Sequence, residues 1–344
     1  MLNSYYNSTN AQQRLIYEKI LSAASGYRES VYLDCTNLAE IASAVEEFIF
    51  DHPECYHVAL NFYKLQPMAT STRLILQYHD VDESRFENEL NRFQTEISIR
   101  LNGKEGDYEK CKVVYDYLLE TVEYATQAQD DYFEIKRTDP NQQNKTAWEN
   151  YISRHGLYFV AYGPIVEKRG TCLGLALAYK LLLNRLGIEA SCVAATLRTD
   201  CNGDVPHTLN VVEVEGRRAF VDLTQGFPAP NLPMIRYDSF LVSRSVVEGY
   251  CTPRGNWDCE NDDDNFFAKN HVRFDTLHAL RNYLYGVSYH ATDGKIRFQY
   301  LGQARDDYLE KMFGNIISDR CGNEYQIVGF YIQNGIGNCC ITRL

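Results

Sequence analysis

The stretch "KRGTCLGLALAYKLLLNRLGIEA", residues 168–190, places one cysteine, Cys172, between a glycine and a long apolar run. The run has the length and composition of a helix with little polar surface, so we expect it to be buried on most sides. Gly170 breaks the chain before it and Gly187 stops it. Cys172 is therefore predicted at the helix N-terminus, where unpaired N–H groups and the helix dipole stabilise a thiolate. The alternative is a buried thiol that only fills space. The apolar residues of the run are Leu173, Leu175, Ala176, Leu177, Leu181, Leu182, Leu183 and Leu186.

A nucleophilic thiolate needs a base, and the base needs a group that orients it. One histidine, His207, follows the cysteine helix in the adjoining strand region, "VPHTLNVVEVEGRRAFVDLTQ", residues 205–225. This region reads as a hairpin with a two-residue turn at Glu215 and Gly216. Counting outward from that turn puts His207 and Asp222 on one face as diagonal neighbours, about 7–8 Å apart. The sequence thus predicts a working pair, with a surface histidine as the alternative.

Charge and cysteine usage restrict the class of protein. The 344-residue chain has a net charge of −12 and no lysine- or arginine-rich run, which argues against nucleic acid or an anionic membrane as the main partner. We find no signal peptide and no stretch of about 18 apolar residues, and we expect a cytoplasmic protein without a membrane-spanning helix. The 11 cysteines form no C-x-x-C pair, so we expect reduced thiols and no zinc site of the usual spacing.

Hydrophobic periodicity predicts alternating helices and strands along the chain. The polar segment 125–151 is predicted to be a long loop near the site. The proline-rich stretch 226–233 marks a boundary. Helices are predicted at 10–25, 36–50 (capped by Thr36 or Asn37), 82–101, 107–124, 275–287 and 304–316, and strands at 56–65, 72–79, 190–197, 208–215, 218–224, 295–301 and 325–332.

"GTCLGLALAYKLLLNRLGIEA" followed by "HTLNVVEVEGRRAFVDLT" resembles the transglutaminase-like superfamily of bacterial proteins. That family has a cysteine opening a helix that ends in "LGI", a histidine-x-x-asparagine strand, and an aspartate in the next strand. The resemblance implies a papain-like triad with Cys172 as nucleophile, His207 as general base and acid, and Asp222 as orienter. It also implies an α+β fold in which the cysteine-bearing helix packs on an antiparallel sheet. The expected regions are an N-terminal α/β segment at 1–105, a catalytic core at 106–228 and a C-terminal α/β region at 229–344.

The same resemblance implies an enzyme that acts on peptide or protein amides through an acyl-enzyme. Hydrolysis, as by a protease, amidase or deamidase, is favoured over protein crosslinking because water is always present. The N–H of Cys172 is the first candidate to bind the oxyanion. Tyr162, in "AYGP", and Asn210, the asparagine of the family pattern, are further candidates for oxyanion or substrate binding. We expect no metal and no organic cofactor, and the sequence does not reveal the oligomeric state.

Two other readings stay open. A catalytically weak or inactive module of the same fold could bind a protein or peptide partner, and Leu209 favours this reading, because the family usually has an aromatic residue there. A metal-binding protein could use Cys251, Cys259 and His271, although their spacing is irregular.

Overall fold

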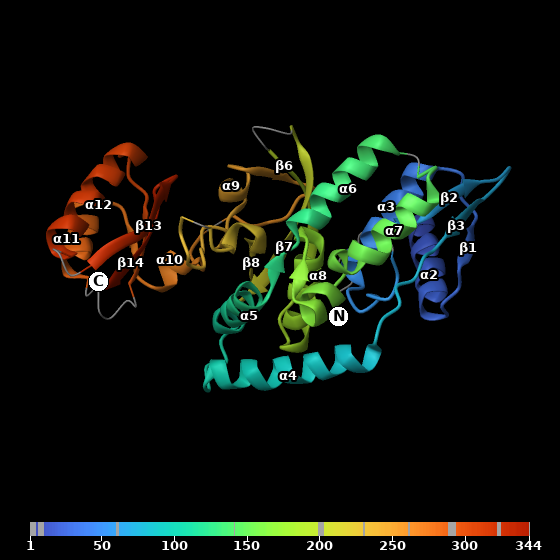
Figure 1. The fold of residues 1–344 in the computed structure, drawn as a ribbon, viewed down its shortest axis with the longest axis horizontal. Helices are drawn as coiled ribbons and strands as arrows, with labels where there is room; N and C mark the ends of the chain where they lie inside the picture. The colour runs from blue at the N-terminus through green and yellow to red at the C-terminus, as the bar shows by residue number, and fades with distance from the viewer. Residues whose placement is uncertain are drawn as a thin grey trace. The chain divides into compact units, whose positions relative to one another are not determined.

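The computed structural model describes residue 5 and residues 10–59, 62–140, 142–198, 203–229, 231–260, 262–287, 294–321 and 325–343 (Figure 1). The chain divides into two compact units. The first unit comprises Met1–Arg218, Asp222–Thr224 and Glu248–Trp257, and the second comprises Ala219–Val221, Gln225–Val247 and Asp258–Leu344. The division into regions 1–105, 106–228 and 229–344 stays a prediction.

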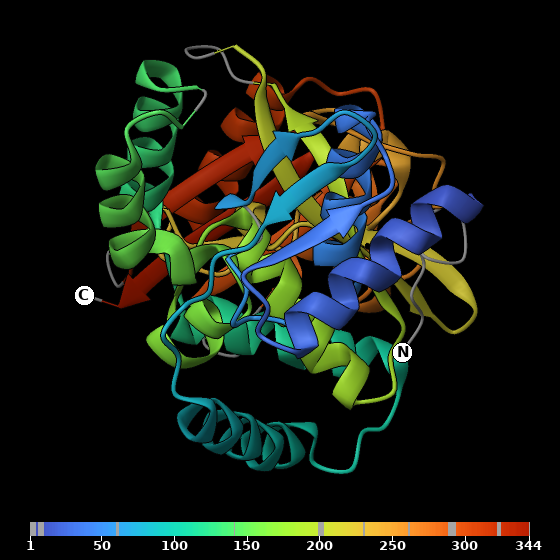
Figure 2. The ribbon, with the colours of Figure 1, turned by 90° about the vertical axis from the view of Figure 1, so that its right-hand side faces the viewer.

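The first unit begins with two capped helices and a small sheet. Asn10 caps α2 (Ala11–Ser25) through a capping box with Gln13, and Asn37 caps α3 (Leu38–Asp51). The antiparallel strands β1 (Ser30–Leu33), β3 (Thr72–Ile75) and β2 (Lys64–Pro67) pair in that order. Figure 2 shows these strands and helices in blue and cyan. The strands predicted at 56–65 and 72–79 do pair with each other, as β2 and β3. However, β2 overlaps the predicted range 56–65 only at its last two residues.

The rest of the first unit surrounds the cysteine helix. Its elements are α4 (Glu83–Leu101), α5 (Asp107–Thr121), β4 (Glu123–Tyr124), α6 (Thr126–Thr138), α7 (Lys145–His155), the 3-10 turn η2 (Gly156–Phe159), the π-turn η3 (Gly163–Glu167), β5 (Arg169–Gly170), α8 (Cys172–Arg185), β6 (Ala190–Leu197), β7 (Val205–Val214) and β10 (Cys251–Pro253). β10, β6 and β7 are antiparallel neighbours in this order.

Helix α8 is the buried centre of this unit. It starts at Cys172, and Gly187, with φ of 78°, follows its last turn, as the sequence predicts. Every residue from Gly174 to Leu183 is buried. The helix packs on β6 and β7, beside which it lies in Figure 1, and on α5. The predicted α+β fold, with a cysteine-bearing helix on an antiparallel sheet, is confirmed.

The loop predicted at 125–151 is wrong, because this segment contains α6 and the start of α7. Asn144 caps α7 by accepting from the N–H of Ala147 at 3.1 Å. Trp148 and Tyr151 of α7 enter a buried cluster with Phe62 and Phe159. In each helix the few apolar side chains lie on one face and the other residues are polar. The sequence of the segment is therefore mostly polar, although one apolar face of each helix is buried.

Two predicted boundaries near the site also move. The helix predicted to reach residue 124 ends at Thr121, so Tyr124 belongs to a strand. The two-residue turn is confirmed, since Glu215 and Gly216 both have positive φ between β7 and β8 (Arg217–Val221). However, β8 ends at Val221, and a 3-10 turn, η4 (Leu223–Gly226), begins just after Asp222.

The second unit has its own sheet and core. β11 (Arg273–Phe274), β12 (Lys295–Tyr300), β14 (Ile336–Arg343) and β13 (Tyr325–Gln333) pair in that order. The sheet shares a core cluster with α11 (Leu277–Gly286) and α12 (Asp306–Cys321), in which Phe298 and Phe313 are buried. The predicted helices and strands of this region are confirmed, and β14 is an additional strand. Three short elements complete the unit: β9 (Phe240–Val242), α9 (Arg244–Val247) and α10 (Phe266–Lys269). Of these, β9 pairs with β8.

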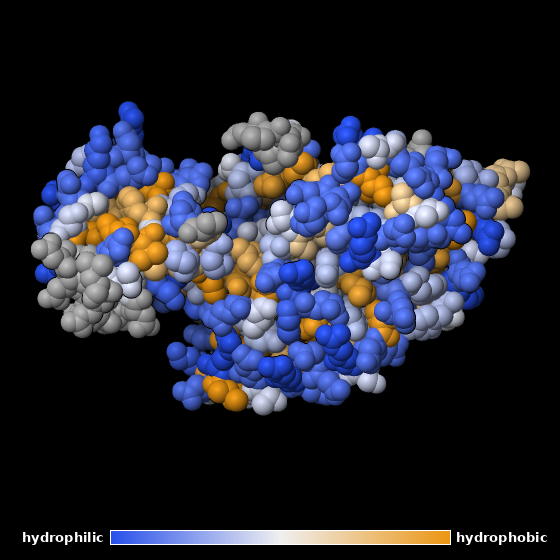
Figure 3. All heavy atoms as spheres, viewed as in Figure 1, coloured by the Kyte–Doolittle hydropathy of each residue, from blue (hydrophilic) through white to orange (hydrophobic). Residues whose placement is uncertain are grey.

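The exposed face of α4 is mostly polar. Along α4, at the lower edge of the view in Figure 3, hydrophilic residues dominate the surface, while Phe86, Leu90, Phe93 and Ile97 face inward. Among the described residues, no helix combines the length and the apolar composition that crossing a membrane requires.

Candidate active site

Cys172 is held at the start of α8 by contacts of the residue before it. The Thr171 hydroxyl donates to the carbonyl oxygen of Tyr158 at 3.1 Å instead of capping the helix. The Thr171 N–H donates to the same oxygen at 2.9 Å. A Cβ at Gly174 would overlap that carbonyl oxygen, so glycine allows the helix to approach it closely. The thiol of Cys172 is consequently fixed in position and remains half-buried and free of any disulfide.

His207 and Asp222 form a buried pair. Nε2 of His207 lies 2.7 Å from Oδ2 of Asp222, and the two side chains are 3% and 1% exposed. The other carboxylate oxygen accepts from the N–H of Thr224 at 3.0 Å and from its hydroxyl at 2.6 Å. The hydroxyl of Tyr250 donates to Oδ2 at 3.1 Å. These contacts fix the carboxylate, which in turn fixes the orientation of the imidazole ring.

The negative charge of Asp222 and the positive charge of protonated His207 stabilise each other. Burial disfavours a protonated His207, but the Asp222 charge and hydrogen bonds to Asp222 and Cys172 outweigh it and raise the pKa of His207 well above its usual value. Burial also disfavours an ionised Asp222, yet the His207 charge and hydrogen bonds from His207, Thr224 and Tyr250 lower the pKa of that carboxyl. His207 is therefore a strong proton acceptor beside an ionised aspartate.

The thiol of Cys172 completes the contacts of His207. A hydrogen bond joins the Cys172 side chain to His207. Since Nε2 faces Asp222, Nδ1 is the ring nitrogen that remains for the thiol. The structure thus brings together Cys172, His207 and Asp222, the three residues that the sequence selects.

One further residue, Tyr124, reaches the thiol and was missed by the sequence analysis. β4 pairs with β5 in parallel, which places Tyr124 opposite Gly170, two residues before Cys172. The Tyr124 hydroxyl donates to Oε1 of Gln129, on α6, and also hydrogen-bonds the main chain and side chain of Cys172. No sequence signal marks a two-residue parallel pairing, so Tyr124 could not be selected in advance.

The other two predicted site residues lie elsewhere. Tyr162 is 3% exposed and stacks on Phe86, with ring centroids 5.8 Å apart. Asn210 is fully buried, and its Nδ2 donates to the carbonyl oxygens of Ala176 at 3.0 Å and Ser191 at 3.3 Å. Neither residue lines the cavity at Cys172. The structure therefore does not bring Tyr162 or Asn210 to the thiol: Tyr162 packs in the core, and Asn210 ties α8 to β6.

A cavity of about 710 Å³ opens over the thiol. Cys172 and His207 lie in its lining, together with one face of α3 and one face of α6. Its aromatic lining is formed by Phe50, Tyr63, Tyr132, Phe133 and Phe159. Glu46 and Arg254, which also line it, form an ion pair. The cavity has the size and mixed lining that are typical of ligand-binding pockets.

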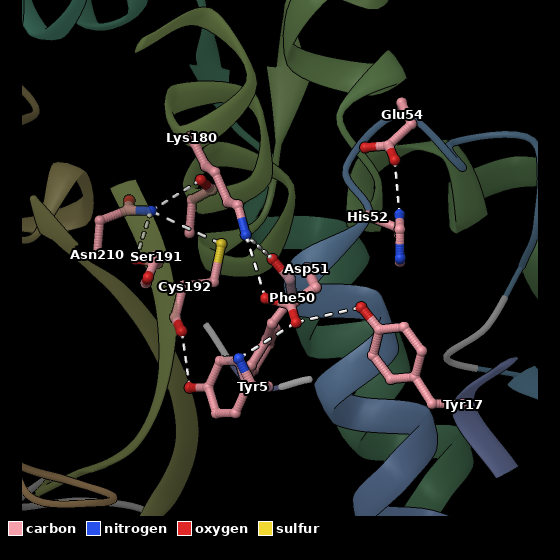
Figure 4. A network of polar contacts seen from close by, with 11 residues as sticks. Tyr5, Tyr17, Phe50, Asp51, His52, Glu54, Lys180, Ser191, Cys192 and Asn210 are labelled. Carbon is pink, nitrogen blue, oxygen red and sulfur yellow. Dashed lines mark hydrogen bonds and ion pairs between the residues drawn. The ribbon is translucent and has the colours of Figure 1, made fainter. Parts of the chain in front are cut away.

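A buried polar network joins α8 to the end of α3 (Figure 4). The ammonium group of Lys180, which is fully buried, donates to the carbonyl oxygen of Phe50 at 2.7 Å and lies 3.5 Å from Oδ1 of Asp51. Oδ2 of Asp51 accepts from the hydroxyl of Tyr17 at 3.1 Å and from the N–H of Tyr5 at 3.2 Å. Because α3 forms one wall of the cavity, this network fixes that wall relative to α8.

Among the described residues, one group of side chains could hold a metal ion. The ligand atoms of His52, Glu54 and Cys55 lie within 4.8 Å of one another. Nδ1 of His52 is 2.6 Å from Oε1 of Glu54, so these two atoms pair with each other. The group does not include Cys251, Cys259 or His271, the metal set considered from the sequence, and none of its members lines the cavity at Cys172.

No family model and no curated protein matches this chain. Similar solved structures include a TGase at 16% identity and a TM-score of 0.31, covering 47% of this chain and 43% of that chain. A candidate cysteine protease from Cytophaga hutchinsonii is 13% identical, with a TM-score of 0.25 and coverages of 50% and 65%. A candidate protease from Parabacteroides distasonis is 8% identical, with a TM-score of 0.27 and coverages of 80% and 55%. This chain therefore matches less than two thirds of the length of each.

Proposed function

We propose that this protein is a thiol enzyme that acts on amide bonds of peptides or proteins through an acyl-enzyme, with Cys172 as nucleophile. The observation that supports this most is the position of His207, which hydrogen-bonds both the Cys172 thiol and the buried carboxylate of Asp222. A nucleophile, its base and the group that orients the base have this geometry in triad enzymes.

In the acylation step, His207 takes the thiol proton and the sulfur attacks the amide carbonyl carbon. A C–S bond forms, and the π electron pair of the carbonyl moves to its oxygen, giving a tetrahedral oxyanion. As the oxyanion collapses, the C–N bond breaks and protonated His207 gives its proton to the leaving amine. Asp222 stabilises the imidazolium that exists between these two proton transfers.

In the second step, His207 takes a proton from water as the water oxygen attacks the thioester. A C–O bond forms and the C–S bond breaks. Protonated His207 returns its proton to the sulfur, which regenerates the thiol as the acid is released. An amine in place of water would give transfer or crosslinking by the same sequence of bonds. We favour hydrolysis, because water is present at far higher concentration than any amine.

Cys172 should be the most reactive thiol of the chain. Burial raises the pKa of the Cys55, Cys192 and Cys251 thiols to about 12, whereas Cys172 lines an open cavity beside a base. We expect iodoacetamide at pH 7 to modify Cys172 at least about tenfold faster than any of these three. Mass spectrometry of proteolytic peptides over a time course measures each rate.

A denatured sample provides the control, since all thiols should then react at similar rates. A second control is His207→Gln, in which the advantage of Cys172 should shrink because the thiol has lost its base. Equal rates at Cys172 and Cys251 in the native protein would remove the main support for a nucleophile.

The aromatic lining predicts a preference for a bulky apolar side chain near the cleaved amide. Phe133 projects from α6 into the cavity and contacts the Tyr132 ring, with centroids 5.9 Å apart. We expect Phe133→Ala to raise the KM for peptides with such a side chain about tenfold. Glu134→Ala, on the exposed side of the same helix, is the matched control and should leave KM unchanged. An equal KM change for peptides with small side chains would contradict this preference.

A further inference from the structure

Tyr124 is a polar group beside the thiol whose role the proposed triad leaves open. The parallel pairing of β4 with β5 fixes its main chain: the N–H of Glu123 donates to the carbonyl oxygen of Lys168 at 2.8 Å, and the N–H of Ala125 donates to that of Gly170 at 2.9 Å. Tyr124 is thereby clamped on both sides to the segment that leads into Cys172.

The Tyr124 hydroxyl occupies a defined polar position. It interacts with the main chain and the thiol of Cys172 and donates to Oε1 of Gln129. The main-chain N–H of a nucleophile at a helix start is a usual donor to an oxyanion. The hydroxyl therefore lies next to the point where the carbonyl oxygen of an attacked amide gains its negative charge.

The surroundings keep this hydroxyl protonated. Burial, followed by the nearby charges of Cys172 and Asp222, raises the pKa of the Tyr124 phenol well above its usual value. A phenol that retains its hydrogen at neutral pH can donate it to a developing oxyanion. Gln129 holds that hydrogen in the resting site, and a small rotation about the C–O bond redirects it.

We infer that Tyr124 is a catalytic residue whose hydroxyl, with the N–H of Cys172, binds the oxyanion of the tetrahedral intermediate. This inference rests on the proposed acyl-enzyme function. Tyr124 takes the role that the sequence analysis gave to Tyr162 and Asn210, since Tyr162 stacks on Phe86 and Asn210 binds the carbonyl oxygens of Ala176 and Ser191. Gln129 is the positioning residue that orients the phenol before substrate arrives.

The test compares two reactions of the same thiol in the full-length chain. Acylation by p-nitrophenyl acetate passes through an oxyanion, whereas alkylation by iodoacetamide does not. We expect Tyr124→Phe to lower the Cys172 acylation rate constant about 100-fold, and to change the alkylation rate less than about twofold. Tyr162→Phe, a buried tyrosine outside the cavity, is the matched control and should change neither rate.

A variant that keeps a donor provides rescue and also covers misfolding of Tyr124→Phe. We expect 4-aminophenylalanine at position 124 to restore most of the acylation rate, because its N–H can replace the phenol hydrogen. Wild-type acylation rates in Tyr124→Phe, faster acylation, or a parallel fall in alkylation would each overturn the inference. If wild-type protein is alkylated at Cys172 but forms no acetyl adduct there, the proposed function itself fails, which is a different result.

Discussion

Replacing Asp222 by asparagine should lower kcat by about 10³–10⁴-fold while leaving the fold intact. The carboxylate holds His207 in the tautomer and orientation that the thiol needs, and it offsets the burial of the imidazolium. An asparagine of the same shape can keep the contacts with Thr224 but cannot supply the negative charge. Steady-state hydrolysis of a fluorogenic peptide and acylation by p-nitrophenyl acetate measure the loss.

The pH dependence of this variant has a definite sign. In the wild-type protein the Asp222 charge outweighs burial and raises the pKa of His207. Without that charge, burial dominates and the pKa of His207 falls, so His207 becomes a weaker base. We expect the acid limb of the Cys172 alkylation profile to move to lower pH in Asp222→Asn, because a base with a lower pKa stays deprotonated at lower pH. An unchanged acid limb would show that Asp222 does not tune His207.

The same pair predicts how the stability difference varies with pH. The folded state lowers the pKa of Asp222. Its contribution to the free energy of unfolding is therefore fully present above the unfolded-state pKa of 3.8, and it is lost as pH falls through the folded-state pKa. The folded state raises the pKa of His207. Its contribution to the free energy of unfolding is therefore fully present below the unfolded-state pKa of 6.5, and it is lost as pH rises through the folded-state pKa. The free energy of unfolding of wild type minus that of Asp222→Asn should be largest between these limits. Asp34→Asn, at an exposed ion pair, is the control and should show little dependence.

Replacing Lys180 by methionine should destabilise the protein by about 3–5 kcal/mol. The change leaves the carboxylate of Asp51 buried without its cation and removes the donor to the carbonyl oxygen of Phe50. A loss of this size corresponds to a Tm lower by about 10 °C. Denaturant titration of the full chain, followed by circular dichroism, measures it.

Two variants separate the buried charge from lysine removal in general. Lys19→Met breaks an exposed ion pair with Asp34 and should cost at most about 1 kcal/mol. Lys180→Met combined with Asp51→Asn should recover part of the loss, since no charge is then left buried. If Lys180→Met and Lys19→Met were equally stable, the buried pair would contribute nothing.

The triad residues could be selected from the sequence because each has a strong local signal. Cys172 lies between a glycine and an apolar run, and the two-residue turn at Glu215 and Gly216 sets the positions of His207 and Asp222. The strand ends before Asp222, yet the pairing holds because the carboxylate is fixed by Thr224 and Tyr250 instead of by sheet hydrogen bonds.

The remainder could not be predicted because it depends on contacts between segments far apart in the chain. Tyr124 reaches Cys172 only through a two-residue parallel pairing, which has no periodicity to detect. Helices α6 and α7 were missed because their buried stripes are narrow and their other faces are polar. Tyr162 looked suitable from its position upstream of the cysteine, but its ring packs on Phe86 instead.

The pairing of β4 with β5 keeps one wall of the cavity and the proposed reacting groups on different segments of the chain. It joins the two ends of the segment that contains α6 and α7, directly beside the nucleophile. Apart from Gln129, this segment contributes to the wall of the cavity and not to the reacting groups. Insertions, deletions or exchanges within it can therefore alter which substrates enter while the thiol keeps its place, so a change of specificity during evolution need not disturb the triad.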